Sequence, residues 1–437
     1  MLYITKSNMN TLRFILKHHR ILLMINLVLF IFLFWRVKKT GRKSNDHGIF
    51  PRNTDFSCPD LWQSGSSGKM AVQRATEFIK THHRHMISNS QYSDLTKDCA
   101  TFQKERGYVM GSMTSEEEDY PIAYSIVMYK DVEQVERLLR AIYRPQNVYC
   151  IHVDAKTSNE TYETVTKIIN CFPNVFHAPI RVNVTWGKPS MMMPDLICMA
   201  ALLKHSTKWR YFINLTGQEF PLKTNGELVR ILKALRGAND LEGTLKRRST
   251  HRFRYSYKTK KRKPPPPLQI VPYKGNMHMT ASRGFVDFIV NDPKAHTFYK
   301  WVEDTRYPEE TYFSTLQHNA HLGAPGAYTG NLPETNINSR KPFLSRYMVW
   351  LPDTDCQGRF VRQVCVMGVG DLQTLTTRKE LFVNKLHLDF QFLALDCLEE
   401  WIFQKMREEY ATGRKLDTTY YEGLEFVRNC NCNITDK

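Results

Sequence analysis

The stretch YPIAYSIVMYKDVEQVERLLRAIYRPQNVYCIHVDAK, residues 120–156, decides the fold class. Its apolar run at 121–128 has the length of a buried strand, residues 132–143 carry apolar side chains at helical spacing, and 148–153 form a second apolar run. Such a succession predicts two parallel strands joined by a right-handed crossover. Asp154 would then follow the carboxyl end of a strand, where open α/β sheets bind ligands, although a simple turn aspartate is the alternative.

The same alternation continues along the chain. Beyond the opening stretch, further helices are predicted over 161–169, 196–203 and 226–235, and further strands over 174–178 and 211–215. Residues 58–120 indicate a helical region with weak patterning, and 401–437 a final helix with a polar tail. We therefore expect an α/β fold, with a mostly parallel central sheet flanked by helices, over residues 121–400.

The N-terminal residues predict a membrane anchor at 21–36, between a cytoplasmic tail (1–20) and a stem (37–57). The run ILLMINLVLFIFLFW is short against the roughly 20 residues that span an average bilayer, but a short span suits the thinner membranes of the early secretory pathway. A cleaved signal peptide is the alternative, yet no small-residue cleavage site follows the run. We expect an uncleaved signal anchor.

Features after this run indicate a lumenal location. All ten cysteines and the four Asn-x-Ser/Thr sequons follow it, which suits an oxidising compartment. The sequons are at Asn159, Asn183, Asn214 and Asn433. Because Asn214 falls in an apolar, strand-like stretch, its glycosylation is not expected.

The net charge of +18 is compatible with nucleic acid, anionic membranes or phosphate-bearing substrates as partners. Residues 258–263 even resemble a nuclear localisation patch. The anchor and the cysteines point outside the cytosol, however, so we interpret this run as a solvated basic loop and expect no nucleic-acid partner.

Several segments together resemble the core 2 / I-branching β-1,6-N-acetylglucosaminyltransferase family, of which this chain would be a divergent member, over roughly residues 55 to 400. They are 120–131, 137–156, 171–179, 213–225 (INLTGQEFPLKTN), 289–310 and 381–389 (LFVNKLHLD). The resemblance implies a GT-A-type glycosyltransferase fold and inverting, β-1,6 transfer of N-acetylglucosamine from UDP-N-acetylglucosamine (UDP-GlcNAc) to a mucin-type O-glycan such as core 1. It also implies a single-pass type II protein of the Golgi membrane with a lumenal catalytic domain.

The resemblance also implies a set of disulfides. It pairs Cys58 with Cys397, Cys99 with Cys171, Cys150 with Cys198, and Cys356 with Cys365. Thr216 stands where the family has a lone unpaired cysteine. For Cys430 and Cys432 two outcomes stay open, a local disulfide or bridges between two chains, and the second would make a homodimer. A zinc site is disfavoured because only these last two cysteines lie close together.

Inverting sugar transfer needs a base for the acceptor hydroxyl and positive charge behind the departing diphosphate. The resemblance assigns the base to Glu310, in DTRYPEE (304–310), and the positive charge to Arg362 and Lys385, so that no metal cofactor is expected. Asp154 would contact the uridine of the donor. The alternative metal motif, Asp-Thr-Asp at 353–355, precedes a cysteine in a loop instead of closing an apolar strand.

For the acceptor sugar the resemblance points to Glu242, Arg252 and Trp350, whose flat apolar ring is suited to stacking on a pyranose. Glu309 is expected to complement the dipole of a helix N-terminus, while Glu310 acts as the base.

Three segments, 186–196, 275–278 and 128–130, depart from the family pattern. The alternative is therefore a catalytically inactive Golgi member that binds a glycan or a protein partner. A related peptide-xylosylating enzyme is a third reading, which the 144–154 stretch and the cysteine spacing oppose. Because Glu310, Arg362 and Lys385 are present, we favour an active enzyme with an altered choice of acceptor.

Overall fold

The computed structural model describes residues 57–244, 250–330 and 343–432, all within one compact unit, Asn53–Lys437. The predicted tail, the anchor at 21–36, the stem up to residue 56 and Asn433 lie outside the described residues. Within the described ranges, no helix has both the length and the apolar character needed to cross a bilayer.

The centre of this unit is a six-stranded, mostly parallel sheet with the strand order β3-β2-β1-β4-β7-β6. Strands β3, β2, β1 and β4 run parallel to one another, and β7 runs antiparallel to both β4 and β6. The strands are β1 (Ile122–Met128), β2 (Val148–Val153), β3 (Val175–His177), β4 (Tyr211–Thr216), β6 (Asp240–Leu241) and β7 (Met279–Ser282). The predicted parallel sheet is thus confirmed.

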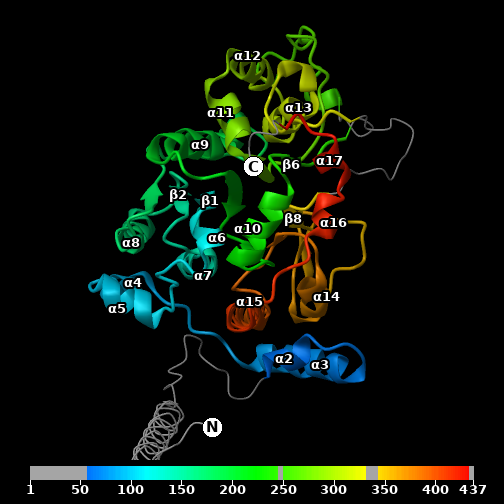
Figure 1. Cartoon of the computed structure of the whole chain (residues 1–437). Helices are drawn as coiled ribbons and strands as arrows, with labels where there is room; N and C mark the ends of the chain where they lie inside the picture. Colours follow the sequence, from blue (N-terminus) through cyan, green and yellow to red (C-terminus); the bar gives the residue numbers. More distant parts are fainter. Residues whose placement is uncertain (1–56, 245–249, 331–342, 433–437) are drawn as a thin grey trace, which may run out of the picture. The chain divides into compact units, whose positions relative to one another are not determined.

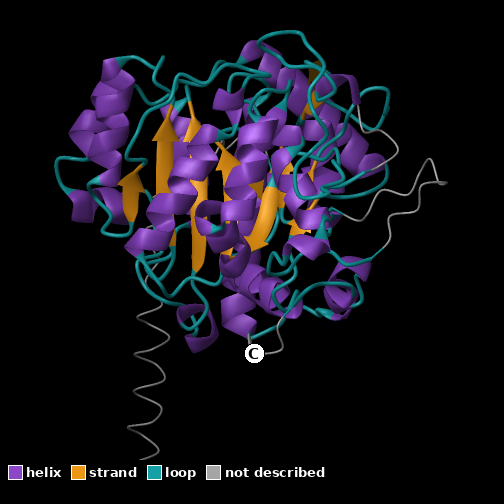
Figure 2. Ribbon diagram, turned by 90° about the horizontal axis from the view of Figure 1, so that it is seen from above, coloured by secondary structure: helices purple, strands orange, loops and turns teal. Residues whose placement is uncertain are grey.

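Helices cover both faces of this sheet (Figures 1 and 2). One face is covered by α7 (Val132–Ile142), α8 (Asn159–Ile169) and α10 (Asn225–Ala234). The other is covered by α9 (Met193–His205), α11 (Arg283–Asn291), α12 (Pro293–Val302) and α13 (Tyr312–His318). Along β1, Ile122 and Tyr124 pack in the first layer while Ala123 packs in the second. Because both faces of the sheet are buried, the sequences of these strands are continuous apolar runs and do not alternate between apolar and polar residues.

The chain before β1 is helical, as predicted. Its helices are α2 (Cys58–Leu61), α3 (Ser66–Thr81), α4 (Asn89–Leu95), α5 (Cys99–Glu105) and α6 (Ser115–Glu118). After the sheet come α14 (Leu372–Thr377), α15 (Phe392–Thr412), α16 (Thr419–Glu422) and α17 (Glu425–Arg428). Helix α15 runs without a break through residues 400 and 401, where the sequence suggested a boundary.

Two small β-units were not predicted. Strands β5 (Glu219–Pro221), β11 (Phe382–Asn384) and β8 (Arg346–Tyr347) form a second sheet in the order β5-β11-β8. Strands β9 (Arg359–Val361) and β10 (Val364–Val366) form a hairpin. Each strand has only two or three residues, too few for an alternating pattern to show in the sequence.

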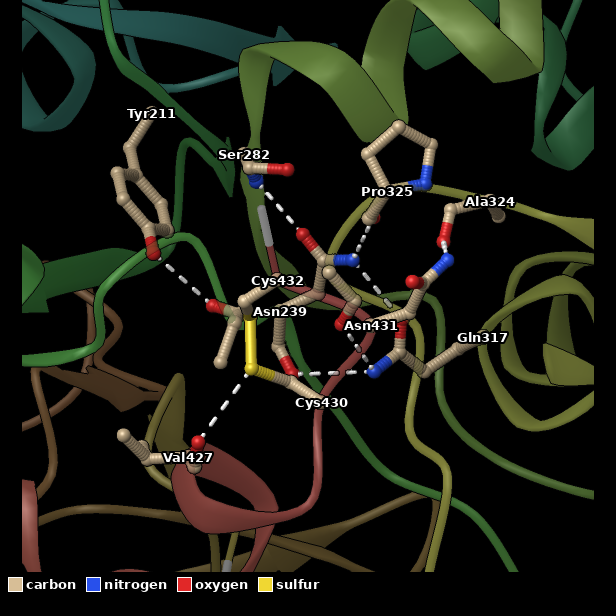
Figure 3. Close-up of a disulfide and its surroundings, with 12 residues drawn as sticks. Tyr211, Asn239, Ser282, Gln317, Ala324, Pro325, Val427, Cys430, Asn431 and Cys432 are labelled. Atoms are coloured by element: carbon tan, nitrogen blue, oxygen red, sulfur yellow. Dashed lines mark hydrogen bonds between the residues drawn. A yellow bond between two sulfur atoms is a disulfide. The ribbon is translucent and has the colours of Figure 1, made fainter. Parts of the chain in front are cut away.

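The structure contains the four disulfides that the resemblance implies. A fifth, between Cys430 and Cys432, is local, so no cysteine is left free. Figure 3 shows this disulfide beside Asn239, with Asn431 reaching the backbone of Ala324. Asn431 also exchanges backbone hydrogen bonds with the segment 326–327, at 2.7 and 2.8 Å. This end of the predicted polar tail is therefore held against the folded unit.

Candidate active site

The carboxyl ends of β1 and β2 present the first two candidate residues. Lys130 lies just beyond β1, and Asp154 follows β2 directly. The Asp154 carboxylate is buried and accepts hydrogen bonds from the backbone N–H and the Nζ of Lys156, at 2.8 and 2.9 Å. The backbone oxygen of Asp154 accepts a further bond from Arg181 (3.0 Å). This carboxylate is thus fixed at the edge formed by the carboxyl ends of the parallel strands, where open α/β sheets bind ligands, and its contact with a donor stays a prediction.

Three cations gather beside this edge. Lys385 directly follows β11, and burial lowers its pKa; the nearby charges of Arg362 and Lys130 lower that pKa further. Lys130 forms ion pairs with Asp131 (2.9 Å) and Asp389 (3.6 Å). We call Lys130, Arg362 and Lys385 the cation cluster. The structure thus brings together the two cations that the sequence assigned to the diphosphate and adds Lys130, a position where the sequence departs from the family pattern.

Arg362 owes its position to the β9–β10 hairpin. Arg362 and Gln363 form its two-residue turn, and both have left-handed backbones, with φ of 52° and 69°. A turn of this type matches the twist of the two strands but costs roughly 1–2 kcal/mol for each residue with a Cβ. The Cys356–Cys365 disulfide fixes the hairpin, and the N–H of Met367 donates to the carbonyl of Lys385 (2.9 Å). The hairpin therefore holds Arg362 close to Lys385.

Glu310 lies in a second group of charges. It ends a short 3₁₀ helix, η3 (Pro308–Glu310), which leads into α13. Its carboxylate forms an ion pair with Arg252 and a longer one with Lys274 (3.4 Å). Arg252 also lies over the ring of Tyr307, 4.5 Å from the ring centre. The structure therefore brings the predicted base and the predicted acceptor contact Arg252 together, and adds Lys274, which the sequence reasoning missed.

The segment around Gly275 connects Glu310 with Glu242. The N–H of Gly275 donates to the backbone oxygen of Glu310 (2.7 Å), and the hydroxyl of Ser314 in α13 donates to the backbone oxygen of Glu242 (2.7 Å). A Cβ at residue 275 would lie 2.2 Å from the Glu242 oxygen, so only glycine fits there. The segment 275–278, which departs from the family pattern, thus packs directly against the candidate base.

Glu309 does not have the role expected from the sequence. It was predicted to complement the dipole of a helix N-terminus, and it does lie in the first turn of η3, but its side chain is buried and η3 has no side-chain cap. Its Oε2 atom is enclosed without a hydrogen-bond partner among the described residues. Burial raises the pKa of Glu309 to about 7; the neighbouring Glu310 raises it further, while Arg252 opposes the rise. The expectation was wrong because packing, and not the local pattern, turns this side chain inward.

Hydrogen bonds and strand pairs connect the two groups through the second sheet. Asn276 follows Gly275, and its amide contacts the sulfur of Met348 (3.9 Å), just beyond β8. Strand β8 pairs with β11, which ends immediately before Lys385. Asn214, within β4, also bonds to both sides of residue 278: its side-chain amide donates to Met277 O (2.9 Å) and its side-chain oxygen accepts from Met279 N–H (2.8 Å). A continuous framework therefore positions Glu310 and the cation cluster.

Other predicted residues have different surroundings. Trp350 is 40% exposed. Its backbone forms an isolated antiparallel β-bridge with Val364 of the β9–β10 hairpin, so it lies beside the turn that carries Arg362. Residues 353–355, the Asp-Thr-Asp motif, are exposed and follow that tryptophan. Across the described ranges, no group of three or more His, Cys, Asp or Glu side chains is arranged to hold a metal ion.

Asn214 is buried, and its amide donates to Asp195 (2.8 Å), which agrees with the expectation that this sequon is not glycosylated. The Asn159 and Asn183 side chains, in contrast, are exposed.

A cavity of about 380 Å³ lies next to this region and contains none of the predicted residues. Tyr273, His318, His321 and Tyr328 are among the residues that line it. Tyr273 directly precedes Lys274, so the cavity adjoins the segment that contacts Glu310.

Comparison with known proteins is consistent with this geometry. The profile of the Core-2/I-Branching enzyme family matches residues 122–376. The human β-1,3-galactosyl-O-glycosyl-glycoprotein β-1,6-N-acetylglucosaminyltransferase 3 is 37% identical over 342 residues, which cover 74% of this chain and 77% of that protein. The bovine protein of the same name is 36% identical over 81% of this chain and 84% of its own length. A bovine herpesvirus 4 β-1,3-galactosyl-O-glycosyl-glycoprotein β-1,6-N-acetylglucosaminyltransferase is also 36% identical, over 74% of this chain and 76% of its own. This chain belongs to the Core-2/I-branching enzyme family.

Proposed function

We propose that this protein is a GT-A-type β-1,6-N-acetylglucosaminyltransferase, which transfers N-acetylglucosamine from UDP-GlcNAc to an O-glycan on a glycoprotein. The activities for which its relatives are named support the reaction class and the acceptor class. The observation that carries the proposal is the cation cluster of Lys130, Arg362 and Lys385 at the edge of the parallel sheet. A cluster of this kind suits a departing nucleoside diphosphate.

In the proposed mechanism Glu310 accepts the proton of the acceptor hydroxyl as its oxygen attacks the anomeric carbon of the donor. The bond from that carbon to the diphosphate breaks at the same time, and the configuration inverts. Negative charge builds up on the diphosphate, where Arg362, Lys385 and Lys130 stabilise it. Arg252 and Lys274 form ion pairs with Glu310 and orient its carboxylate until the acceptor arrives.

We further propose that no metal ion is needed, because the cation cluster can supply the positive charge that the departing diphosphate requires. Activity should therefore persist in EDTA, with the donor and the acceptor saturating. Loss of turnover in EDTA, with recovery on adding manganese, would contradict this part of the proposal.

The direct test of the reaction is Glu310→Gln in the purified lumenal part of the protein. Loss of a general base typically costs about 10²- to 10⁴-fold in turnover. The variant should lose kcat by this factor and keep its affinity for UDP, measured by calorimetry. Glu303→Gln, at the end of α12, is the matched control and should remain active. Full activity of Glu310→Gln would exclude Glu310 as the base.

The second candidate is an inactive glycan-binding or partner protein. One observation favours it: the Asp154 carboxylate, which would contact the donor uridine, is already engaged by Lys156. This reading predicts glycan binding without affinity for UDP, so the same titration separates the two functions.

For the location, we propose a single-pass type II protein of the Golgi membrane with a lumenal enzyme. The apolar run at 21–35, the later sequons and the five disulfides support this. An epitope at the C-terminus should be protected from protease in intact vesicles; digestion there would contradict the orientation. A homodimer stays an open expectation, which sedimentation of the lumenal part would test.

A further inference from the structure

A short antiparallel hairpin next to the candidate base carries an excess of positive charge. Residues 254–263 pair through the N–H of Lys263 and the oxygen of Arg254 (3.0 Å), and the N–H of Ser256 and the oxygen of Lys261 (2.8 Å). We call this segment the basic hairpin. It corresponds to the run interpreted from the sequence as a solvated loop.

Five cations of the basic hairpin form no side-chain ion pair among the described residues, although Lys258 lies close enough to Asp304 to interact with its carboxylate electrostatically. Their side chains are exposed. They are Arg254, Lys258, Lys260, Lys261 and Arg262. Lys263, in contrast, pairs with Asp304 (3.7 Å). Fixing so many like charges on ten residues is electrostatically unfavourable, and a bound anion would remove that penalty.

The segment that carries Glu310 also holds the basic hairpin in place. Asp304 accepts hydrogen bonds from the N–H of Tyr257, through its backbone oxygen, and from the N–H of Lys258, through its carboxylate, both at 3.0 Å. Arg306 donates its N–H to the oxygen of Arg252 (3.0 Å), whose guanidinium pairs with Glu310. Residues 304–310 therefore connect the basic hairpin to the base.

Because of this attachment, the positive charge of the basic hairpin lies on the side of Glu310, where the acceptor would bind. It does not lie beside the cation cluster, where the diphosphate of the donor would bind. The basic hairpin contacts Trp301 and Asp304, whereas the cation cluster belongs to the segment after β1, the β9–β10 hairpin and the segment after β11. Tyr255 is 50% exposed between the charges and offers a flat face for a sugar or a peptide.

From this arrangement we infer that the basic hairpin binds an anionic group on the acceptor glycoprotein, so that the enzyme prefers acidic acceptors. The inference rests on the proposed function and names the substrate class for the same site. The anion is a carboxylate or a sulfate ester, carried either by the glycan or by the flanking peptide. In both cases it would lie beside the hydroxyl that Glu310 deprotonates.

The test compares transfer to one acceptor disaccharide in three settings: on a neutral peptide, on a peptide with flanking glutamates, and with a sulfate ester on the sugar. For the wild type we expect kcat/KM about tenfold higher for at least one acidic acceptor, since steering by fixed charge reaches this size. The acidic acceptor that shows the preference identifies the source of the anion. Equal kcat/KM for all three would overturn the inference.

The variant Arg254→Gln, Lys258→Gln, Lys261→Gln, Arg262→Gln should abolish the preference and keep kcat/KM for the neutral acceptor. Lys260 is retained because its Nζ donates to the backbone oxygen of Tyr257 (2.7 Å) within the hairpin. The matched control removes four exposed cations elsewhere: Lys69→Gln, Lys104→Gln, Lys204→Gln and Lys208→Gln. A preference that survives in the hairpin variant, or is lost equally in the control, would overturn the inference.

A salt titration of the wild type gives an independent measurement if the variant does not fold. The preference should shrink several-fold between low salt and about 0.3 M NaCl, because exposed charges are screened. A preference that does not change with salt would overturn the inference. Absence of transfer to every acceptor would instead contradict the proposed function, so the two failures are distinguishable.

Discussion

Glu309 and Glu310 are neighbours in the chain but have opposite environments. The Glu310 carboxylate is partly exposed and lies between Arg252 and Lys274. Glu309 is buried, and burial raises its pKa to about 7. Two successive residues of a 3₁₀ helix point in different directions, so one can face a site while the other enters the core.

At this scale the first prediction concerns Glu309→Gln. A carboxyl group whose pKa is raised on folding keeps its proton in the folded state while the unfolded chain loses it. Stability is therefore lost as pH rises from about 4.5 to about 7, by roughly 3 kcal/mol in all. The variant lacks this loss, so its free energy of unfolding in urea should rise relative to the wild type between pH 5 and pH 8. A constant difference over this range would contradict the burial of an ionisable Glu309.

The second prediction concerns the cation cluster. Arg362→Gln and Lys385→Gln should each lower kcat by about a hundredfold to a thousandfold, because each removes a charge from the developing anion. Both should also weaken UDP binding in calorimetry, unlike Glu310→Gln. Lys204→Gln, at the exposed end of α9, is the control. Unchanged turnover in either variant would remove that residue from the proposed mechanism.

At the scale of elements, a buried ion cluster joins α7 to α15. Glu399 of α15 is fully buried and accepts bonds from Arg137 (2.7 Å) and Arg140 (3.1 Å) of α7. Arg137 also pairs with Asp396 at 2.7 Å. Since α7 follows β1, this cluster fixes the helix that leads away from the edge of the sheet where Lys130 lies.

Glu399→Ala should therefore be strongly destabilising. It leaves two buried guanidinium groups without their main partner, and such a loss typically costs about 3–5 kcal/mol. The free energy of unfolding in urea measures it. Asp94→Asn, which breaks the exposed pair with Lys97, is the control and should have no measurable effect. A loss in Glu399→Ala no greater than that of the control would show that the cluster does not stabilise the interface.

At the scale of the whole molecule, disulfides join distant parts of the described chain. The Cys58–Cys397 bridge connects α2 with α15 across 339 residues, whereas Cys430–Cys432 spans only two. A crosslink restricts the unfolded chain more when it closes a longer loop, although measured effects depend on the native geometry as well.

Removing the long bridge should thus cost more than removing the short one. The double variant Cys58→Ala, Cys397→Ala should lose about 2–5 kcal/mol in the free energy of unfolding. The double variant Cys430→Ala, Cys432→Ala should lose less, as measured by urea denaturation without reductant. A larger loss in the Cys430/Cys432 variant would contradict this prediction. It would indicate that the contacts of Asn431 with the folded unit, which depend on the local disulfide, stabilise the protein more than the Cys58–Cys397 disulfide does.

The sequence by itself determined the parallel sheet, its crossover helices and the position of Asp154 at a strand end. Those features follow from local periodicity, because a run of apolar residues specifies strand or helix over a few neighbours. The family resemblance supplied four disulfide pairs and the assignment of Glu310, Arg362 and Lys385. Two- and three-residue strands such as β8 and β11 left no comparable local signal.

Only the tertiary structure decided which distant side chains meet. It paired Arg252 with Glu310 and turned Glu309 inward. It also attached the basic hairpin to Asp304. Each of these outcomes depends on packing and on hydrogen bonds between residues far apart in the chain, or on which side of a short turn is covered. No local pattern encodes such contacts, because they depend on the arrangement of all the surrounding elements.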